Sequence, residues 1–232
     1  MCGRVKLEGD FSQLKIAFKI PDDYPTPNSY VPSWNVAPTD NLPIVRYNEK
    51  TTSRTLDLMR WGLVPYWAKD LKIGFSTINA MAETVDTKPV FREAFARRRC
   101  LVPVEAFYEW KKLGPKEKQP YAIALAGGGF MALAGLWENW KSPAGEWTRS
   151  FTIITTTPNG LCAEIHDRMP VILPPKEWPL WLGEDAAEPE QLKAVLRPYL
   201  AEDMTCWPVS ARVGNVRNND PSLIEPIELT AA

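Results

Sequence analysis

GFMALAGLW (residues 129–137) and SFTIITTT (residues 150–157) are the two stretches that decide the fold class. Both are compact apolar or β-branched runs of the kind found in buried strands. Similar runs occur at residues 54–64, 120–127 and 169–173. The 22 prolines and 13 glycines interrupt the chain often, so we expect short elements joined by many loops. These patterns predict a mixed α+β fold built around a strongly curved, largely antiparallel β-sheet.

Other local patterns predict one turn and three short flanking helices. AGGGF, residues 126–130, lacks the lysine and the serine or threonine of a phosphate-binding loop, and we expect it to form a hairpin turn. Apolar residues recur at helical spacing in residues 10–18, 88–99 and 189–200. Asp10 suits the N-cap of the first helix, and Pro198 is expected to end or bend the third.

Length and composition bound the class of protein. The chain has 232 residues, 45% of them hydrophobic, and we expect one domain over residues 1–232. Its formal net charge is −1, so a nucleic acid would have to meet a local basic patch. Residues 1–25 lack the apolar core of a signal peptide, and no window approaches the ~20 apolar residues that cross a bilayer. We therefore expect a cytoplasmic protein without membrane contact, associated with the nucleoid if it is bacterial.

The four cysteines, at positions 2, 100, 162 and 206, are scattered without CxxC spacing. This pattern predicts neither a disulfide framework nor a structural zinc site. Cys100 and Cys162 lie among apolar neighbours and are expected to be inert core residues. Cys2 differs, because removal of Met1 would make it the amino terminus.

An amino-terminal cysteine carries two nucleophiles. Its α-amine has a reference pKa of about 7.7–8.0 against about 10.4 for lysine, so far more of the amine is neutral at pH 7. Its thiol has a reference pKa of about 8.5, and we expect Arg4 to increase the thiolate fraction. The pair could condense with an aldehyde to a thiazolidine, or the thiol could attack an amide with the amine as base. A cysteine at residue 2 is also compatible with no function.

Three further segments carry candidate chemistry. The single histidine, His166, has the unperturbed pKa of a proton shuttle, although a lone histidine is more often structural. Glu105 and Glu109 lie beside aromatic residues, where partial desolvation is expected to raise the pKa of a carboxyl group; a solvated strand glutamate is the alternative. Asn79 suits either a turn or a polar anchor for a reacting oxygen.

Aromatic and basic residues indicate a nucleic-acid surface. RWGLVPYW, residues 60–67, has a composition that suits the stacking of bases. Arginines at positions 92, 97, 98, 99, 212 and 217 are candidate phosphate contacts. For Arg97 and Arg98 we favour a solvated face instead.

Seven segments, read in chain order, resemble the motifs of the SOS response-associated peptidase (SRAP) family. They are MCGR, WNVAPT, RWGLVPYWAKD, INAMAET, KPVFREAFARRRCLVPVEAFYEW, IHDRMPVIL and VSARVGNVRNND, and they run from residue 2 to about residue 220. The family includes bacterial and human proteins that bind single-stranded DNA and link covalently to abasic sites. The resemblance implies an α+β fold, a monomer without cofactor or metal, and single-stranded DNA with abasic sites as the partner.

The resemblance also implies roles for matching residues. Cys2, freed of Met1, would form a thiazolidine with the open-chain aldehyde of an abasic site. Asn79 would help hold the amine and the sugar oxygen, Glu109 would orient or deprotonate the amine, and His166 would protonate the sugar oxygen and assist reversal. Glu105 does not occupy the motif position. The implied DNA contacts are Gly3, Arg4, Asn35, Pro38, Trp61, Tyr66, Trp67, Arg92, Arg168, Ser210 and Arg212.

The chain departs from the family pattern at Met81, where the motif usually has an arginine expected to grip a phosphate. DNA binding would then be weaker, or would depend on Arg4, Arg92 and Arg168. The family name implies that the protein removes its own Met1, and ordinary methionine trimming would give the same product. Two alternatives stay open: a glutamine amidotransferase of the N-terminal nucleophile class, and a noncovalent binder of modified bases that would not need Cys2.

Overall fold

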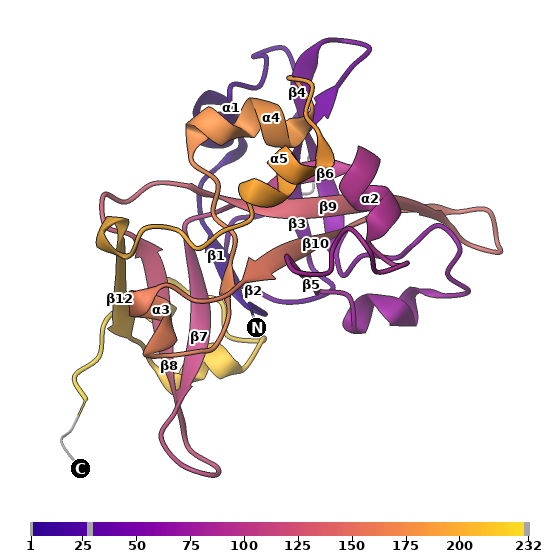
Figure 1. Ribbon diagram of the computed structural model, residues 1–232. Coiled ribbons are helices and arrows are strands. Elements are labelled where there is room, and N and C mark those ends of the chain that lie inside the picture. The colour runs from indigo at the N-terminus through magenta and orange to yellow at the C-terminus, as the bar shows by residue number, and fades with distance from the viewer. Residues whose placement is uncertain (1, 27–29, 230–232) are drawn as a thin grey trace.

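The computed structural model describes residues 2–26 and 30–229 (Figure 1). The strands in these residues are β1 (Val5–Leu7), β2 (Ser33–Val36), β3 (Asn41–Asn48), β4 (Ser53–Trp61), β5 (Asn79–Met81), β6 (Arg99–Val104), β7 (Ala106–Lys112), β8 (Lys118–Leu125), β9 (Met131–Lys141), β10 (Trp147–Thr156), β11 (Met169–Pro170) and β12 (Met204–Pro208). The helices are α1 (Phe11–Phe18), α2 (Arg92–Arg97), α3 (Gly160–Ala163), α4 (Trp178–Leu182) and α5 (Pro189–Ala194). Short 3₁₀ turns are η1 (Leu71–Phe75), η2 (Pro175–Glu177), η3 (Ala201–Asp203), η4 (Ala211–Gly214) and η5 (Pro221–Leu223).

Five strands close into a ring. Their order is β10-β4-β3-β6-β9, and β9 pairs back onto β10. Only β4 and β5 run parallel to their neighbour β10 among the pairings of the described residues. The two stretches that predicted the fold lie in this ring, where residues 131–136 and 150–156 are buried. The prediction of a mixed α+β fold with a curved, largely antiparallel sheet is confirmed.

Gly135 lies where β6, β9 and β10 approach one another closely. A Cβ atom at this position would stand 2.9 Å from Val102 Cγ2 and 3.0 Å from the backbone oxygen of Thr152. Real Cβ contacts are rarely this short, so the ring closes at this point only because residue 135 has no side chain.

A second sheet, of order β12-β8-β7-β1-β2, is antiparallel throughout. One cluster of buried apolar side chains joins this sheet to the ring and includes Val5, Phe107 and Ile123 from the sheet and Leu133 and Ile153 from the ring. The hairpin turn predicted at residues 126–130 is wrong, because β8 pairs with β7 and β12 whereas β9 pairs with β6 and β10. This stretch instead carries the chain from one sheet to the other.

The predicted helices form, and two further ones were missed. Asp10 caps α1 as expected, since its carboxylate accepts the Gln13 N–H at 2.8 Å. Residues 92–97 form α2, and the third helix, α5, ends at Ala194, four residues before Pro198. Proline lacks an N–H and disfavours helical backbone at the preceding residue, so the apolar spacing after residue 194 does not prolong the helix. The helices α3 and α4 are too short to show a period in the sequence.

Pairing of β1 with β7 places the amino-terminal segment. Val5 lies opposite Phe107, and the Tyr108 N–H donates to the Arg4 carbonyl at 2.9 Å, so the chain before β1 runs toward Glu109. Because side chains alternate along a strand, Phe107, Glu109 and Lys111 share one face of β7. Phe107 pairs with Ile123 and Ile123 with Cys206, so Cys206 belongs to the same face, where α3 packs against β12 (Figure 1).

Candidate active site

Cys2 is completely buried. Burial raises the pKa of its thiol, the nearby Glu109 carboxylate raises it further, and the backbone of Arg4 partly opposes the change. The expected activation of the thiol by the Arg4 side chain is therefore wrong for the enclosed protein. The Arg4 guanidinium is directed elsewhere and donates to Asn35 Oδ1 at 2.8 Å and to the Val213 carbonyl at 2.7 Å. Burial thus favours the protonated form of the Cys2 thiol. Met1 lies outside the described residues.

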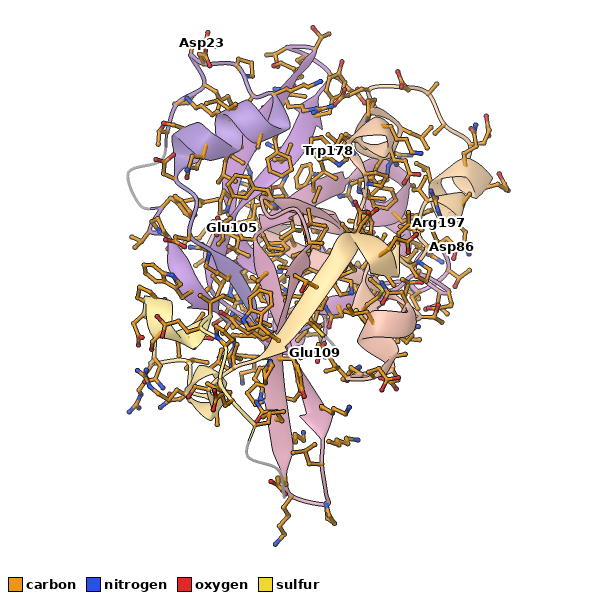
Figure 2. The ribbon with its side chains drawn as sticks, turned by 90° about the vertical axis from the view of Figure 1, so that its left-hand side faces the viewer. Asp23, Asp86, Glu105, Glu109, Trp178 and Arg197 are labelled. Atoms are coloured by element: carbon orange, nitrogen blue, oxygen red, sulfur yellow. The ribbon has the colours of Figure 1, made fainter. Side chains whose placement is uncertain are left out.

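Glu109 is the buried carboxyl group of the site, with 3% of its surface exposed (Figure 2). Burial raises its pKa, and the nearby His166 partly opposes the change. The expectation of a desolvated glutamate in this stretch is confirmed for Glu109. Glu105 has a structural environment instead, because its carboxylate accepts from Lys6 Nζ at 3.1 Å and from the Glu8 N–H at 2.6 Å.

His166 follows α3 and faces a groove. Its backbone N–H donates to the Cys162 carbonyl at 2.9 Å, which ties the histidine to the end of α3. Its Nδ1 lies 3.1 Å from the Arg168 N–H and 2.8 Å from Asp167 Oδ1. Both contacts use the same ring nitrogen, which can accept from the Arg168 N–H or, when it carries a hydrogen, donate to the Asp167 carboxylate. An open groove of about 550 Å³, lined by residues 110–112 and 164–167, reaches this side chain.

Asn79 begins β5, opposite Ile153 of β10. Its Nδ2 donates to the Ile78 carbonyl at 3.0 Å, whereas its buried Oδ1 has no hydrogen-bond partner among the described residues. A buried amide oxygen without a donor is costly unless a ligand group supplies one. The geometry therefore favours the polar-anchor interpretation of Asn79 over a turn former.

Trp61 does not belong to a base-stacking surface. It is completely buried, its ring stacks on Phe151 at 6.1 Å between centroids, and its Nε1–H donates to the Ile78 carbonyl at 3.0 Å. This carbonyl also accepts from Asn79, so Trp61 packs behind the anchor rather than contacting a ligand.

Tyr66 and Trp67, in contrast, are exposed, with 62% and 51% of their surfaces accessible. Phe75, 64% exposed, adds an aromatic side chain that the sequence analysis missed, and Arg60 lies 6.0 Å from its ring centroid. Phe75 ends η1 in the mostly apolar stretch LKIGF, where no spacing rule distinguishes an exposed aromatic residue from a core residue.

The remaining predicted DNA contacts fall into two groups. Arg92 is exposed on α2 and has no ion pair or side-chain hydrogen bond within residues 2–26 and 30–229. The others either make hydrogen bonds within the protein, as Arg4, Asn35, Arg168, Ser210 and Arg212 do, or are partly buried, as Gly3 and Pro38 are. Asn35 is buried and donates to the Asn218 carbonyl at 2.7 Å, which joins the amino-terminal region to a loop near the other end of the chain. Ser210 Oγ accepts the Arg212 N–H at 3.3 Å, and the Arg212 side chain donates to Asp220 at 2.8 Å.

Arg168 lies beside the position where this chain departs from the motif. It donates to both Glu83 oxygens, at 2.6 and 2.9 Å, and to the Thr155 carbonyl at 2.6 Å. Thr155 pairs with Met81, whose side chain is 41% exposed. A phosphate near Met81 would therefore compete with Glu83 for the Arg168 guanidinium.

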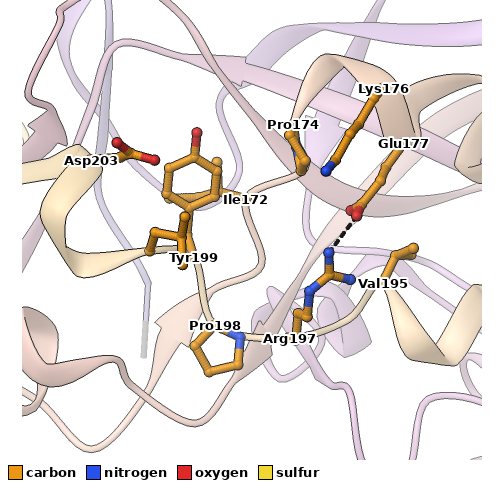
Figure 3. A pocket seen from close by; sticks show the side chains of 10 residues that line it. Ile172, Pro174, Lys176, Glu177, Val195, Arg197, Pro198, Tyr199 and Asp203 are labelled. Atoms are coloured by element: carbon orange, nitrogen blue, oxygen red, sulfur yellow. Dashed lines mark hydrogen bonds and ion pairs between the residues drawn. The ribbon is translucent and has the colours of Figure 1, made fainter.

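A separate pocket lies away from these residues. Its lining includes Ile172, Tyr199 and Asp203, and the Arg197–Glu177 ion pair, 2.5 Å long, closes one side (Figure 3). None of the candidate residues named above lines this pocket. The described residues contain no group of three or more histidine, cysteine or acidic side chains placed to hold a metal ion. None of the helices within them is long and apolar enough to cross a membrane.

A buried cysteine at residue 2, a desolvated carboxyl group at Glu109 and the histidine His166 are the candidate reactive groups of this site. The model of the SOS response associated peptidase (SRAP) family matches residues 1–216, and the chain belongs to this family. It is 45% identical over 225 residues to the abasic site processing protein YoqW of Bacillus subtilis (strain 168), covering 97% of this chain and 99% of that protein. It is 32% identical over 242 residues to the abasic site processing protein HMCES of Mus musculus, covering 88% of this chain and 67% of that protein. A crystal structure of a protein from Bacteroides thetaiotaomicron has the same fold, with a TM-score of 0.85 at 24% identity over 98% of this chain and all of the other.

Proposed function

We propose that this protein processes abasic sites in single-stranded DNA by linking itself covalently to them through Cys2. Two relatives at 45% and 32% identity are abasic site processing proteins, which supports the substrate class. The observation that carries the proposal is the position of Glu109, buried on β7 and within electrostatic reach of both Cys2 and His166. Single strands are favoured because the base-free sugar must reach a recessed residue, which a paired strand would obstruct.

The reaction uses both nucleophiles of Cys2 once Met1 is removed. His166 gives a proton to the ring oxygen of the abasic sugar, the bond from that oxygen to the anomeric carbon breaks, and the anomeric hydroxyl gives its proton back to His166, which leaves the open-chain aldehyde. The amine adds to the aldehyde carbon, and loss of one water gives an imine. The sulfur then adds to the same carbon while the thiol proton passes to the nitrogen, which closes a five-membered thiazolidine. The overall change forms one C–N and one C–S bond and releases one water.

The residues around Cys2 divide the proton transfers between them. Glu109, whose pKa is raised by burial, can accept a proton from the amine and return it when water leaves. Asn79 Oδ1, which has no donor among the described residues, can accept an N–H from the reacting amine. Reversal follows the same path backward: water adds to the imine, the amine leaves the regenerated aldehyde, and His166 takes back the proton of the sugar hydroxyl as the ring closes.

The experiment incubates protein whose mass shows loss of Met1 with a single-stranded oligonucleotide carrying one abasic site, followed by a denaturing gel. We expect a shifted band for the wild type and no shifted band for Cys2→Ala. Cys206→Ala is the matched control, because it removes a partly exposed thiol that takes no part in the proposed reaction, and it should crosslink as the wild type does. His166→Ala should slow band formation.

Two results would overturn the proposal. One is a denaturant-stable adduct that persists in Cys2→Ala, which would indicate a lysine Schiff base. The other is crosslinking at the full rate by protein that still carries Met1. Release of ammonia from glutamine, without any adduct, would support the amidotransferase alternative instead.

A further inference from the structure

The β7–β8 hairpin leaves the body of the molecule close to the candidate active site. Its strands pair from Phe107 opposite Ile123 to Lys112 opposite Lys118, and the Leu113 N–H closes the tip on the Glu117 carbonyl at 3.0 Å. Figures 1 and 2 both show this hairpin projecting beyond the rest of the chain. The inner half of the hairpin is buried, whereas residues 111–119 include no buried residue, so the sequence of this outer part is free to serve an external partner.

The outer half of the hairpin carries unneutralised positive charge. Residues 111–118 contain four lysines, Lys111, Lys112, Lys116 and Lys118, and one acid, Glu117. None of these five side chains has an ion pair or a side-chain hydrogen bond within the described part of the chain. Other cations near this sheet are paired, as Lys6 is with Glu105 at 3.1 Å. The hairpin therefore presents a local positive field on a chain whose net charge is −1.

Two of these lysines face each other directly. Lys112 lies opposite Lys118 in the antiparallel register. Like charges at directly opposed positions destabilise a strand pair, and no acid within the described residues forms an ion pair with either lysine. A polyanion between the two side chains would remove this repulsion, so the pair is better suited to a bound state than to the free hairpin.

The charged strand starts inside the candidate site. Glu109 and Lys111 share one face of β7, and at about 3.3 Å per residue the Lys111 backbone lies about 7 Å outward from that of Glu109. Lys111 and Lys112 line the same groove as His166, while Glu164 and Asp167 line it as well. A polyanion leaving the site past His166 would be repelled by the two acids and attracted toward the hairpin lysines.

We propose that this hairpin is a DNA-binding arm that holds the phosphates on one side of the abasic site. The inference rests on the proposed function for the identity of the partner and assigns it a second contact, apart from the surface of Tyr66, Trp67 and Arg92. The arm binds backbone phosphates without reading sequence, because lysine ammonium groups act as point charges.

The test uses the triple variant Lys112→Gln, Lys116→Gln, Lys118→Gln, with Lys111 left in place because it shares one face of β7 with Glu109. The matched control is Lys19→Gln, Lys50→Gln, Lys176→Gln, which removes three unpaired lysines from other parts of the surface. Both variants are made in Cys2→Ala protein, and fluorescence anisotropy measures Kd for undamaged single-stranded DNA over a range of salt concentrations. For the hairpin variant we expect the slope of log Kd against log salt to fall by about 2, because each phosphate that a lysine no longer neutralises lowers the slope by about 0.7. The control should keep the parent slope.

A second measurement assigns the binding arm to one flank. With Cys2 restored, capture rates are compared on oligonucleotides whose abasic site has a flank on the 5′ side only or on the 3′ side only. The hairpin variant should slow capture on one of the two and leave the other unchanged, while reaching the same final yield on both. Equal salt slopes for the hairpin variant and its control, or equal slowing on both flanks, would overturn the arm. If the wild type failed to crosslink while the hairpin variant still showed a smaller salt slope than its control, the proposed function would be overturned. The hairpin would then remain a nucleic-acid contact.

Discussion

Two glutamates near the site show how hydrogen bonding and burial shift the pKa of a carboxyl group in opposite directions. A paired hydrogen bond from Arg168 lowers the pKa of Glu83, which therefore remains charged. Desolvation raises the pKa of Glu109, so its charged form is disfavoured. Glu83 is therefore a fixed anchor for Arg168, whereas Glu109 can exchange a proton at modest cost.

Replacing Glu109 by glutamine tests this difference through stability. A folded pKa above the unfolded value of 4.5 means that ionisation weakens the native state as pH rises through the folded pKa. Below the unfolded value both states are protonated, and the effect disappears. We expect Glu109→Gln to unfold with a higher free energy than the wild type at neutral pH and with a nearly equal one at acid pH, as measured by urea unfolding. Crosslinking by this variant should be slow.

Glu105→Gln is the control, because it weakens the contacts with Lys6 and Glu8 instead of relieving a buried charge. It should lower the free energy of unfolding at neutral pH. If Glu109→Gln behaved like Glu105→Gln at every pH, Glu109 would be a structural carboxylate and not a base.

At the scale of elements, the end of β4 and the loop after it separate two kinds of aromatic residue. Trp61 ends β4 inside the protein, behind the Ile78 carbonyl that also holds Asn79. Tyr66 and Trp67 follow within six residues and point to solvent. Position relative to the core, rather than residue type, therefore decides which of these aromatic side chains is accessible for stacking on a DNA base.

Alanine substitutions at Trp61 and at Trp67 distinguish a core aromatic residue from an exposed one. Trp61→Ala should cost about 3–5 kcal/mol in the free energy of unfolding, because it removes a fully buried ring. Trp67→Ala should change stability by less than about 0.5 kcal/mol and weaken noncovalent binding to single-stranded DNA by about 1–3 kcal/mol. Urea unfolding and fluorescence anisotropy measure the two quantities. Wild-type affinity in Trp67→Ala would remove this residue from the interface.

The elements also show where sequence reasoning succeeds. Strands β9 and β10 were predictable because continuous apolar runs leave no other way to bury them. The passage of the chain from one sheet to the other at residues 126–130 was not predictable. A glycine-rich turn has the same local sequence whether its flanking strands pair with each other or with distant partners. Similarly, the motifs predicted Cys2, Glu109 and His166 as site residues. The burial of Cys2, however, depends on the pairing of β1 with β7, which no local pattern encodes.

At the scale of the whole molecule, the ring holds the site together. β10 belongs to the closed ring and also pairs with β5 and β11. β5 contains Asn79, and β11 begins three residues after His166. A change in the packing of β9 against β10 would therefore displace β5 and β11, which pair with β10, and would alter the site without replacing any of its residues.

Gly135→Ala tests this connection. Its added methyl group would stand 3.0 Å from the Thr152 carbonyl, a backbone atom that cannot move aside cheaply. We expect a loss of about 1–3 kcal/mol in the free energy of unfolding, together with slower crosslinking. Gly127→Ala is the control, because nothing lies within 4 Å of its added methyl group. Equal thermal stability of the two variants would show that the ring tolerates the extra volume.

The pairing of β1 with β7 has a consequence for biosynthesis. Val5 and Lys6 find their strand partners only after Phe107 and Ala106 have emerged from the ribosome. Residue 2 therefore stays uncovered on the nascent chain until β7 has been made. Under the proposed function, which requires removal of Met1, trimming is favoured in this interval, because pairing of β1 with β7 afterwards encloses residue 2.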